Sequence, residues 1–456
     1  MTSRQPPSCY RASVMRCAYS SFTNGMRRSP PTRRELRISR WVVIGAALAM
    51  LVPKLIMSAT TYGTNDVSHW FAFLNAVQHV GPIQVYSYPF RGSLYNHPPL
   101  IGYYLELIGA GTHVGLAANF SIRALSSVAD VFTAFLVFEL LRVRRPLREA
   151  TFAGVVVACS PVLLIISGFH GNTDPLFTML VFLSVYLLVD RKLPVLAGAD
   201  LALALGVKIV PVVVVPCMLV YGLHRGRATL LRFVGSFAGV SALFWVPALL
   251  EQWGPIRRNV LGYSGSTAPE WGLARLGQIA GNPAWASWLP GPGRLLVVAT
   301  CAVVPALLVW RRPDCVVQGV AFALAGFLAL TPAFGTQYLV WGAAAVMLLT
   351  APVGLAFNLM AGALLAIVYT RWNNGLPWNQ AHASLFTSGE LALGLVVWAV
   401  LVWALFDGAR RLPAQHEICV DEGNTLGHRP SRKDDLGSAP QMHRRDAADE
   451  SAFPTP

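Results

Sequence analysis

Charged residues are scarce in this chain of 456 residues. Asp, Glu, Lys and Arg together make up 13% of it, whereas a soluble domain carries about 25%. Lysine is rarer still, with four lysines against 32 arginines. This scarcity nearly excludes a soluble globular enzyme.

Paired cysteines are missing as well. The seven cysteines include no C-x-x-C pair and no metal-ligand spacing, and none falls in a segment that we place outside the membrane. We therefore expect no disulfide bonds and no zinc site. The cysteines are Cys9, Cys17, Cys159, Cys217, Cys301, Cys315 and Cys419.

Apolar residues, by contrast, make up 54% of the chain. A helix that spans a bilayer needs about 20 mostly apolar residues, and twelve segments have that character. They predict an all-α polytopic membrane protein with about 12 transmembrane helices. The segments are 41–57, 122–141, 151–168, 175–190, 193–210, 211–223, 229–250, 294–310, 316–331, 338–350, 353–370 and 389–407.

The formal charge of +14 is typical of some nucleic-acid-binding proteins, but in a membrane protein basic residues usually mark cytoplasmic loops. If the arginine-rich residues 1–40 lie inside, every compact basic loop falls on that same side, which supports the span count. We therefore predict two cytoplasmic termini and no nucleic-acid partner. The loops carry Arg142, Arg144, Arg145 and Arg148, then Arg191 and Lys192, then Arg225 and Arg227, then Arg311 and Arg312.

Three regions follow from this topology. Residues 1–40 are interpreted as a disordered basic arm rather than a cleaved signal peptide, because the first apolar run starts only at Trp41. Residues 41–410 form the transmembrane domain, and the polar residues 411–456 form a disordered cytoplasmic tail. The outer loops are 58–121 and 251–293. Within the first of them, the glycine-rich apolar run 99–117 predicts an interfacial or re-entrant helix.

Asp66 is the candidate catalytic base. It lies in TTYGTNDVSHW (60–70) directly after the first span, where an ionised carboxylate can reach a substrate held in the lipid. The bland alternative is a helix cap, since Asn65 and Asp66 are both good N-cap residues before a helix over 67–77. The same loop ends in YNHPPL (95–100), whose second proline can open the following helix.

These two motifs resemble those of the GT-C membrane glycosyltransferases. The closest likeness is to the lipid-phosphate-sugar-dependent glucosyltransferases that build the N-glycan precursor. The resemblance implies that Asp66 is the catalytic base. His69 and Trp70 also match the family, and His69, Tyr95 and His97 are implied to contact the donor or acceptor sugar.

The resemblance continues in IRALSSVAD (122–130), where an arginine is followed seven residues later by an aspartate. Arg123 and Asp130 share a helix face but lie about 10 Å apart along the axis, so they cannot pair directly. Arg123 is a candidate for binding the donor phosphate. Asp130 either faces a functional interior or joins helices through buried hydrogen bonds.

GFHGNTDPLF (168–177) resembles a turn of the glycolipid-anchor mannosyltransferases and related bacterial GT-C enzymes. His170 and Asn172 are candidates for binding sugar hydroxyls. Asp174 is also a candidate sugar-binding residue, although a purely structural interpretation makes it a helix cap followed by Pro175 at the first helical position.

Two further motifs complete the candidate site. GVKIVPVVVVP (206–216) resembles the K-x-x-P segment of the same mannosyltransferases, and Lys208 would bind the donor phosphate unless it only snorkels to the interface. FGTQYLVW (334–341) resembles the Q-Y-x-x-W signature. It makes Gln337 and Tyr338 candidates for donor binding, or else members of an interfacial belt.

The resemblance implies an inverting transfer of a hexose from a polyprenyl-phosphate sugar to the hydroxyl of a glycolipid, glycan or protein acceptor, on the outer face of a bacterial plasma membrane. No cofactor or metal is expected, because the chain has no nucleotide-binding glycine loop and no D-x-D motif in its outer loops. The QY motif stands where the N-glycan glucosyltransferases carry a His-Glu-Lys segment, so the sugar stays open. A twelve-span secondary transporter and a lipid-carrier flippase are the alternatives.

Overall fold

The computed structural model describes residues 31–91, 93–263 and 270–425. Over these residues the protein is an all-α polytopic membrane protein, with an isolated bridge between Gly63 and Gln380 as the single β-type pairing. Each of the twelve predicted segments coincides with helical structure. Eight helices in the described part are long and apolar enough to cross a membrane: Arg33–Thr60, Ala118–Arg142, Leu147–His170, Arg227–Leu261, Gly293–Arg311, Pro313–Leu330, Ala351–Trp372 and Ser388–Leu412. Four are shorter apolar helices: Asp174–Val189, Pro194–Val207, Val210–His224 and Thr336–Leu349.

Both ends of the predicted transmembrane domain need correction. Helix α2 (Arg33–Thr60) begins at Arg33 rather than Trp41, because Thr32 and Glu35 form a capping box that starts the helix early. Helix α18 (Ser388–Thr425) runs past residue 411, since each residue added to an existing helix gains a backbone hydrogen bond. The rest of the predicted arm and tail, residues 1–30 and 426–456, lies outside the described residues.

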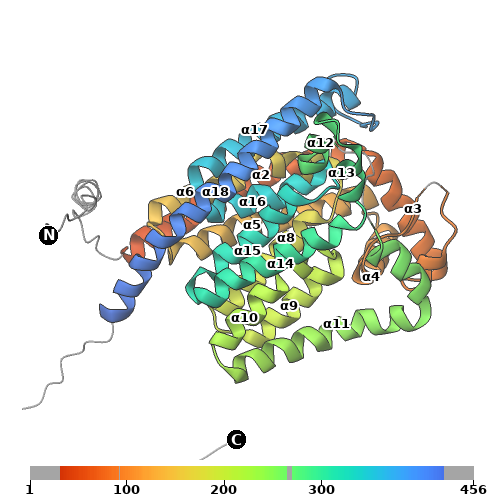
Figure 1. Cartoon of the computed structure of the whole chain (residues 1–456). Coiled ribbons are helices and arrows are strands. Elements are labelled where there is room, and N and C mark those ends of the chain that lie inside the picture. The colour runs from red at the N-terminus through yellow and green to blue at the C-terminus, as the bar shows by residue number, and fades with distance from the viewer. Residues whose placement is uncertain (1–30, 92, 264–269, 426–456) are drawn as a thin grey trace, which may run out of the picture.

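The helices form one bundle (Figure 1). Helix α5 (Ala118–Arg142) packs against α2, against α6 (Leu147–Ala158) and against α8 (Asp174–Val189). The remaining long elements are α9 (Pro194–Val207), α10 (Val215–His224), α11 (Arg227–Ile256), α14 (Gly293–Arg311), α15 (Val316–Leu330), α16 (Leu339–Leu349) and α17 (Ala351–Trp372).

Short elements gather at the end of the bundle that carries α3 (Asn65–Val80) and α4 (Leu100–His113) (Figure 1). Helix α4 follows Pro98 and Pro99 and lies within the glycine-rich apolar run 99–117, where the sequence predicted a helix that does not span the membrane. It packs against α3, α5 and α9. The other short elements are α7 (Pro161–Ile165), α12 (Gly272–Ile279), α13 (Pro283–Trp288), η1 (Gln84–Ser87), η2 (Ile166–His170), η3 (Val210–Val213), η4 (Arg257–Leu261) and η6 (Thr336–Tyr338). Element η5 (Pro313–Cys315) instead joins the other end of α14 to α15.

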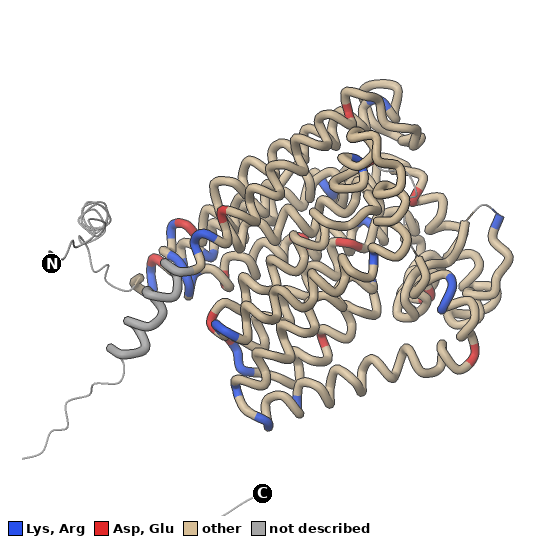
Figure 2. The backbone as a smooth tube through the Cα atoms, in the orientation of Figure 1, with Lys and Arg blue, Asp and Glu red and all other residues tan. Residues whose placement is uncertain are grey.

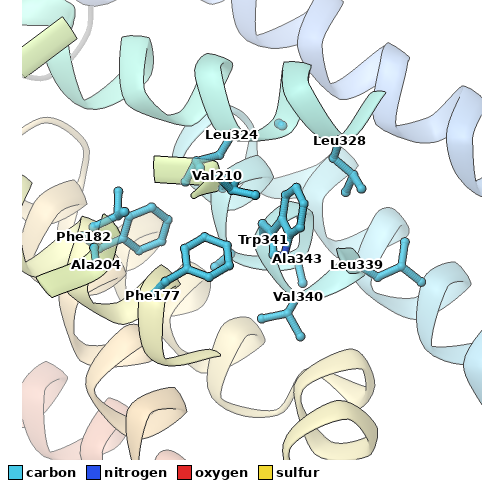
Figure 3. Packing of buried hydrophobic residues seen from close by; sticks show 14 of the residues in the cluster. Phe177, Phe182, Ala204, Val210, Leu324, Leu328, Leu339, Val340, Trp341 and Ala343 are labelled. Carbon is cyan, nitrogen blue, oxygen red and sulfur yellow. The ribbon is translucent and has the colours of Figure 1, made fainter. Parts of the chain in front are cut away.

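An apolar core fills the space between α8, α9, α15 and α16. Trp341 lies among Phe177, Leu328 and Val340 in this core (Figure 3). The Trp341 ring meets Phe177 edge-on, with 5.7 Å between ring centroids, and stacks with Phe327 at 6.0 Å. This packing fixes Trp341, whose ring lies 4.8 Å from that of Tyr338 between centroids.

The outside of the bundle is apolar along several helices. On α11, Leu231, Leu243 and Leu250 are exposed, as expected for side chains that face lipid rather than water. Many lysines and arginines gather at the end of the bundle where α2 begins and α18 ends (Figure 2). At this end Arg144 pairs with Asp190, and Arg145 donates to the carbonyl of Leu349.

Candidate active site

The GFHG segment forms a turn that receives the loop carrying Asp66. Helix α7 continues into η2, a π-helical turn that ends at Gly171, which has a φ of 82°. Thr64 Oγ1 donates to the carbonyl of His170 at 2.8 Å, and Trp70 Nε1 donates to the carbonyl of Gly171 at 2.9 Å. Two motifs that lie about a hundred residues apart are thereby joined at one point.

Two glycines make this close approach possible. Gly63 has a φ of 104°, and a Cβ there would lie 2.7 Å from the carbonyl oxygen of Phe169. A Cβ on Gly171 would lie 2.7 Å from Val67. Because both contacts are shorter than real Cβ atoms make and both φ values are left-handed, only glycine fits at these positions.

Asp66 is not the helix cap that the alternative interpretation made it. Thr64 is the N-cap of α3, and its side chain accepts from the backbone N–H of Asp66. The Asp66 carboxylate instead accepts at Oδ2 from His170 Nε2 at 2.9 Å and from Asn172 Nδ2 at 3.3 Å. With both donors on one oxygen, the other oxygen, Oδ1, is left for a substrate.

The surroundings keep Asp66 ionised. Burial raises the pKa of this carboxyl, but His170, with smaller contributions from His69 and Asn172, outweighs burial and lowers the pKa to about 2. The Asp66 side chain is 34% exposed. Asp66 is therefore charged at physiological pH and accessible to a molecule in the cavity.

A cavity of about 990 Å³ opens beside Asp66. Of the residues singled out in the sequence, the cavity brings together Asp66, His69, His97, Asn172, Lys208, Gln337 and Tyr338. It does not bring Arg123, Tyr95, His170 or Asp174 to its wall. Many of the other lining residues are apolar: Val212, Val213, Val260, Leu261, Leu295, Val297, Val298 and Phe327.

Lys208 reaches this cavity from the end of α9. Its ammonium pairs with Asp174 and lies 4.8 Å from the centre of the Tyr338 ring and 5.8 Å from that of Trp341. Asp174 is fully buried and also accepts from Trp341 Nε1 at 2.8 Å. The side chain of Asp174 is thus the counter-ion of Lys208 rather than a helix cap, and burial keeps it from a sugar. The Asp174 N–H is instead capped by Asn172 Oδ1 at 3.0 Å.

Arg123 is fully buried and does not line the cavity. Its guanidinium donates to the carbonyls of Ser58 and Thr61, each at 2.7 Å, and to Thr61 Oγ1 at 2.9 Å. These acceptors lie at the end of α2, just before the Asp66 loop. An arginine within a membrane helix needs acceptors for its five N–H groups, and here Ser58 and Thr61 supply them. In this geometry Arg123 therefore holds the loop and does not meet a phosphate.

Tyr95 and His97 behave differently although they are close in sequence. Tyr95 is buried and meets the Phe73 ring edge-on, with 5.2 Å between ring centroids, so it packs inside the loop and does not line the cavity. His97 stacks on Trp70 at 4.5 Å and faces the cavity. Burial, and then the nearby Lys208, lower the pKa of His97 to about 3. His97 is therefore a neutral hydrogen-bonding group at physiological pH.

Three residues of this region escaped the sequence analysis. Arg294, in the first turn of α14, lines the cavity, and its place just after the second predicted outer loop was a usable signal. Tyr369 bonds to His170 from α17, and no motif surrounds it. Lys54, which is 2% exposed, is the buried lysine that pairs with Asp130 at 2.6 Å. Its side chain is more deeply buried than that of Lys208, at 3% against 19% exposed.

The apolar bundle and the polar cavity at one end define an integral membrane protein with a candidate catalytic site. Residues 96–250 match the model of the dolichyl-phosphate-mannose-protein mannosyltransferase family. The match indicates a glycosyltransferase of the GT-C type and confirms that resemblance over this segment. No curated protein matches the sequence. The matched segment includes His97, His170, Asn172 and Lys208, whereas Asp66 lies before it.

Proposed function

We propose that this protein transfers a hexose from a polyprenyl-phosphate sugar to an acceptor hydroxyl, on the outer face of a bacterial plasma membrane and with inversion at the sugar. The observation that carries the proposal is the Asp66 carboxylate. One of its oxygens is held by His170 and Asn172, at the wall of a cavity that also contains Lys208.

In the proposed step the acceptor oxygen attacks the anomeric carbon from the face opposite the phosphate. The bond between that carbon and the phosphate oxygen breaks, and its electron pair leaves with the phosphate monoester. Asp66 Oδ1 takes the proton of the acceptor hydroxyl. Lys208 stabilises the negative charge that develops on the leaving phosphate. The step uses neither a cofactor nor a metal ion.

The mixed lining of the cavity suits the two parts of such a donor. Its polar residues Asp66, His69, Asn172 and Gln337 offer groups that bond to sugar hydroxyls. Its apolar residues, which include Val212, Leu295 and Phe327, suit the first isoprene units of the lipid. A glycolipid, glycan or protein would supply the acceptor hydroxyl. A cavity at one end, lined by both Asp66 and Lys208, supports transfer over the transporter and flippase alternatives.

The direct test incubates the purified protein with a panel of polyprenyl-phosphate sugars, beginning with the mannose donor, and repeats each reaction with Asp66→Asn. Asn keeps the shape and loses the basicity, so transfer should fall by about 10²- to 10⁴-fold. Folding and donor binding should stay near those of the parent. Ser68→Ala on the same helix is the control and should transfer normally. Transfer by Asp66→Asn at the parent rate would contradict Asp66 as the base.

A further inference from the structure

A hydrogen-bonded chain runs from the Asp66 carboxylate into the core of the bundle. Asp66 Oδ2 bonds to His170 Nε2 at 2.9 Å, His170 Nδ1 bonds to the Tyr369 hydroxyl, and that hydroxyl bonds to Thr336 Oγ1 at 2.9 Å. Tyr369 is fully buried on α17 and does not line the cavity. It also lies outside the matched segment 96–250.

We infer that Tyr369 is a positioning residue of the site: its hydroxyl fixes the His170 imidazole so that the Nε2–H stays directed at Asp66. The part of this inference that concerns catalysis rests on the proposed function. The part that concerns the His170 ring stands on its own.

The direction of the bonds follows from the chemistry of the groups. An ionised carboxylate only accepts, so His170 Nε2 must carry a proton. The His170 ring is 4% exposed, and with its one proton on Nε2 the ring has one donor and one acceptor nitrogen. In that form Nδ1 is an acceptor, and the Tyr369 hydroxyl donates to it. Thr336 then donates to the Tyr369 oxygen, which leaves every group in the chain satisfied.

Fixing the ring matters because an imidazole ring can occupy the same space in two orientations, which differ by half a turn. Rotation of the ring by half a turn would replace Nε2 with a carbon atom and remove the donor from Asp66. A bond at Nδ1 blocks that rotation, since the flipped ring would also present a carbon to Tyr369. Hydrogen bonds at both ring nitrogens therefore hold a single orientation.

Tyr369 is itself held by its surroundings. Its ring contacts Phe169, with centroids 5.8 Å apart, and meets Trp378 edge-on at 6.0 Å. Phe169 directly precedes His170, and Trp378 lies in the segment between α17 and α18. Tyr369→Phe keeps these ring contacts and removes only the hydroxyl, so the variant is expected to fold.

Imidazole ¹⁵N NMR of the full chain in lipid nanodiscs tests the ring directly, without substrate. The chain has 10 histidines, and His170→Gln assigns the relevant signals. Tyr369→Phe should move the His170 Nδ1 signal towards that of a nitrogen without a donor. Thr336→Val removes the hydrogen bond to the Tyr369 hydroxyl and should move the His170 Nδ1 signal by a smaller amount. Tyr104→Phe is the matched control, because among the described residues the buried Tyr104 hydroxyl has no partner. An unmoved His170 signal in Tyr369→Phe would overturn the inference.

Transfer from polyprenyl-phosphate mannose tests the effect on catalysis. Loss of one neutral hydrogen bond predicts that kcat of Tyr369→Phe falls about 3- to 10-fold, with KM unchanged because Tyr369 does not line the cavity. A looser Nε2–H donates less to Asp66, so the pKa of Asp66 rises and the acid limb of the rate profile moves to higher pH. The variant leaves the other titratable groups near Asp66 in place, namely His69, His97, Tyr263 and Tyr338.

The outcomes separate the two proposals. A fall in kcat with an unmoved acid limb would show a packing role only and overturn positioning. If the parent transfers sugar from no donor of the panel, the proposed function fails, and the NMR comparison still decides whether Tyr369 fixes His170.

Discussion

Asn172 serves two parts of the site with one side chain. Its Oδ1 accepts from the N–H of Asp174 at the start of α8, and its Nδ2 donates to Asp66. The Asp174 carboxylate is thereby free to pair with Lys208. An amide side chain suits this position because its oxygen accepts a hydrogen bond and its nitrogen donates one. At the scale of single residues, neutral Asn172 thus donates to Asp66 and caps the helix that begins with Asp174, the partner of Lys208.

Lys208 should contribute to donor binding. Its replacement by Met removes a charged hydrogen bond to the phosphate, worth about 1.5 to 3 kcal/mol. The single variant also leaves the buried Asp174 without its cation, which costs about 3 to 5 kcal/mol of stability. We therefore expect Lys208→Met/Asp174→Asn to fold like the parent and still bind polyprenyl-phosphate mannose more weakly, as measured by titration calorimetry.

Lys192→Met is the control for the loss of a lysine, because Lys192 is exposed and lies in a loop away from the cavity. This variant should bind the donor as the parent does. Parental donor affinity in the double variant would leave Lys208 as no more than the partner of Asp174.

Much of the site was predictable at this scale from short polar motifs at the ends of apolar runs. Asp66 was found by its place directly after the first span, and Lys208 and Gln337 through the resemblance to the GT-C enzymes. All three line the cavity. The pattern could not show which polar groups are already satisfied inside the protein. Arg123 and Asp174 have the right chemistry for a ligand, but their neighbours in space use it up.

At the scale of helices, the buried ion pair between Lys54 and Asp130 joins α2 to α5. Both side chains are 3% exposed, and Nζ lies 2.6 Å from Oδ2. Spacing along α5 indicated only that Asp130 needs a partner other than Arg123. The partner comes from another helix, so no pattern within one segment could name it. Asp130 therefore joins helices, one of the two roles left open for it.

Removing one member of this pair should destabilise the bundle. Lys54→Met leaves the Asp130 charge buried and unpaired, so we expect a loss of about 3 to 5 kcal/mol in the free energy of unfolding. Lys54→Met/Asp130→Leu removes both charges and should recover most of it. Denaturant unfolding in detergent micelles measures both variants.

Arg40→Met is the matched control. Arg40 is 40% exposed, and its partner Glu139 also pairs with Arg142. Glu139 therefore keeps a cation when Arg40 is replaced, and the variant should lose much less stability than Lys54→Met. Equal losses in the two single variants would contradict the importance of burial for the pair between Lys54 and Asp130.

Helix positions were more predictable than helix ends. All twelve predicted segments are helical, because long apolar runs must satisfy their backbone groups internally in a membrane. The start of α2 at Arg33 depends on the capping box of Thr32 and Glu35, which is a local polar signal rather than an apolar one. Hydropathy alone therefore placed that end too late.

At the scale of the whole molecule, the described ends of the chain near Arg33 and Thr425 lie at the same end of the bundle (Figure 1). The positive-inside rule predicts that this end is cytoplasmic. In a variant without the seven native cysteines, Ser93→Cys should then react with a membrane-impermeant maleimide in intact cells, because Ser93 lies at the cavity.

Arg191→Cys provides the opposite control, since it lies in a basic loop that we predict to be inside. It should react only after the membrane is permeabilised. If Ser93→Cys needed permeabilisation while Arg191→Cys did not, the orientation would be reversed and the cavity would face the cytoplasm.

The bridge between Gly63 and Gln380 also bears on how the protein is made. The N–H groups of Tyr62 and Gly63 donate to the carbonyl of Asn379, and the N–H of Ala381 donates to that of Gly63. The backbone beside Asp66 is therefore completed by residues synthesised near the end of the chain. Domains fold from the N-terminus as they leave the ribosome, but here the first loop must wait for α17 to insert. A nascent chain that stops before α17 therefore holds Asp66 without this backbone support, which forms only when assembly is nearly complete.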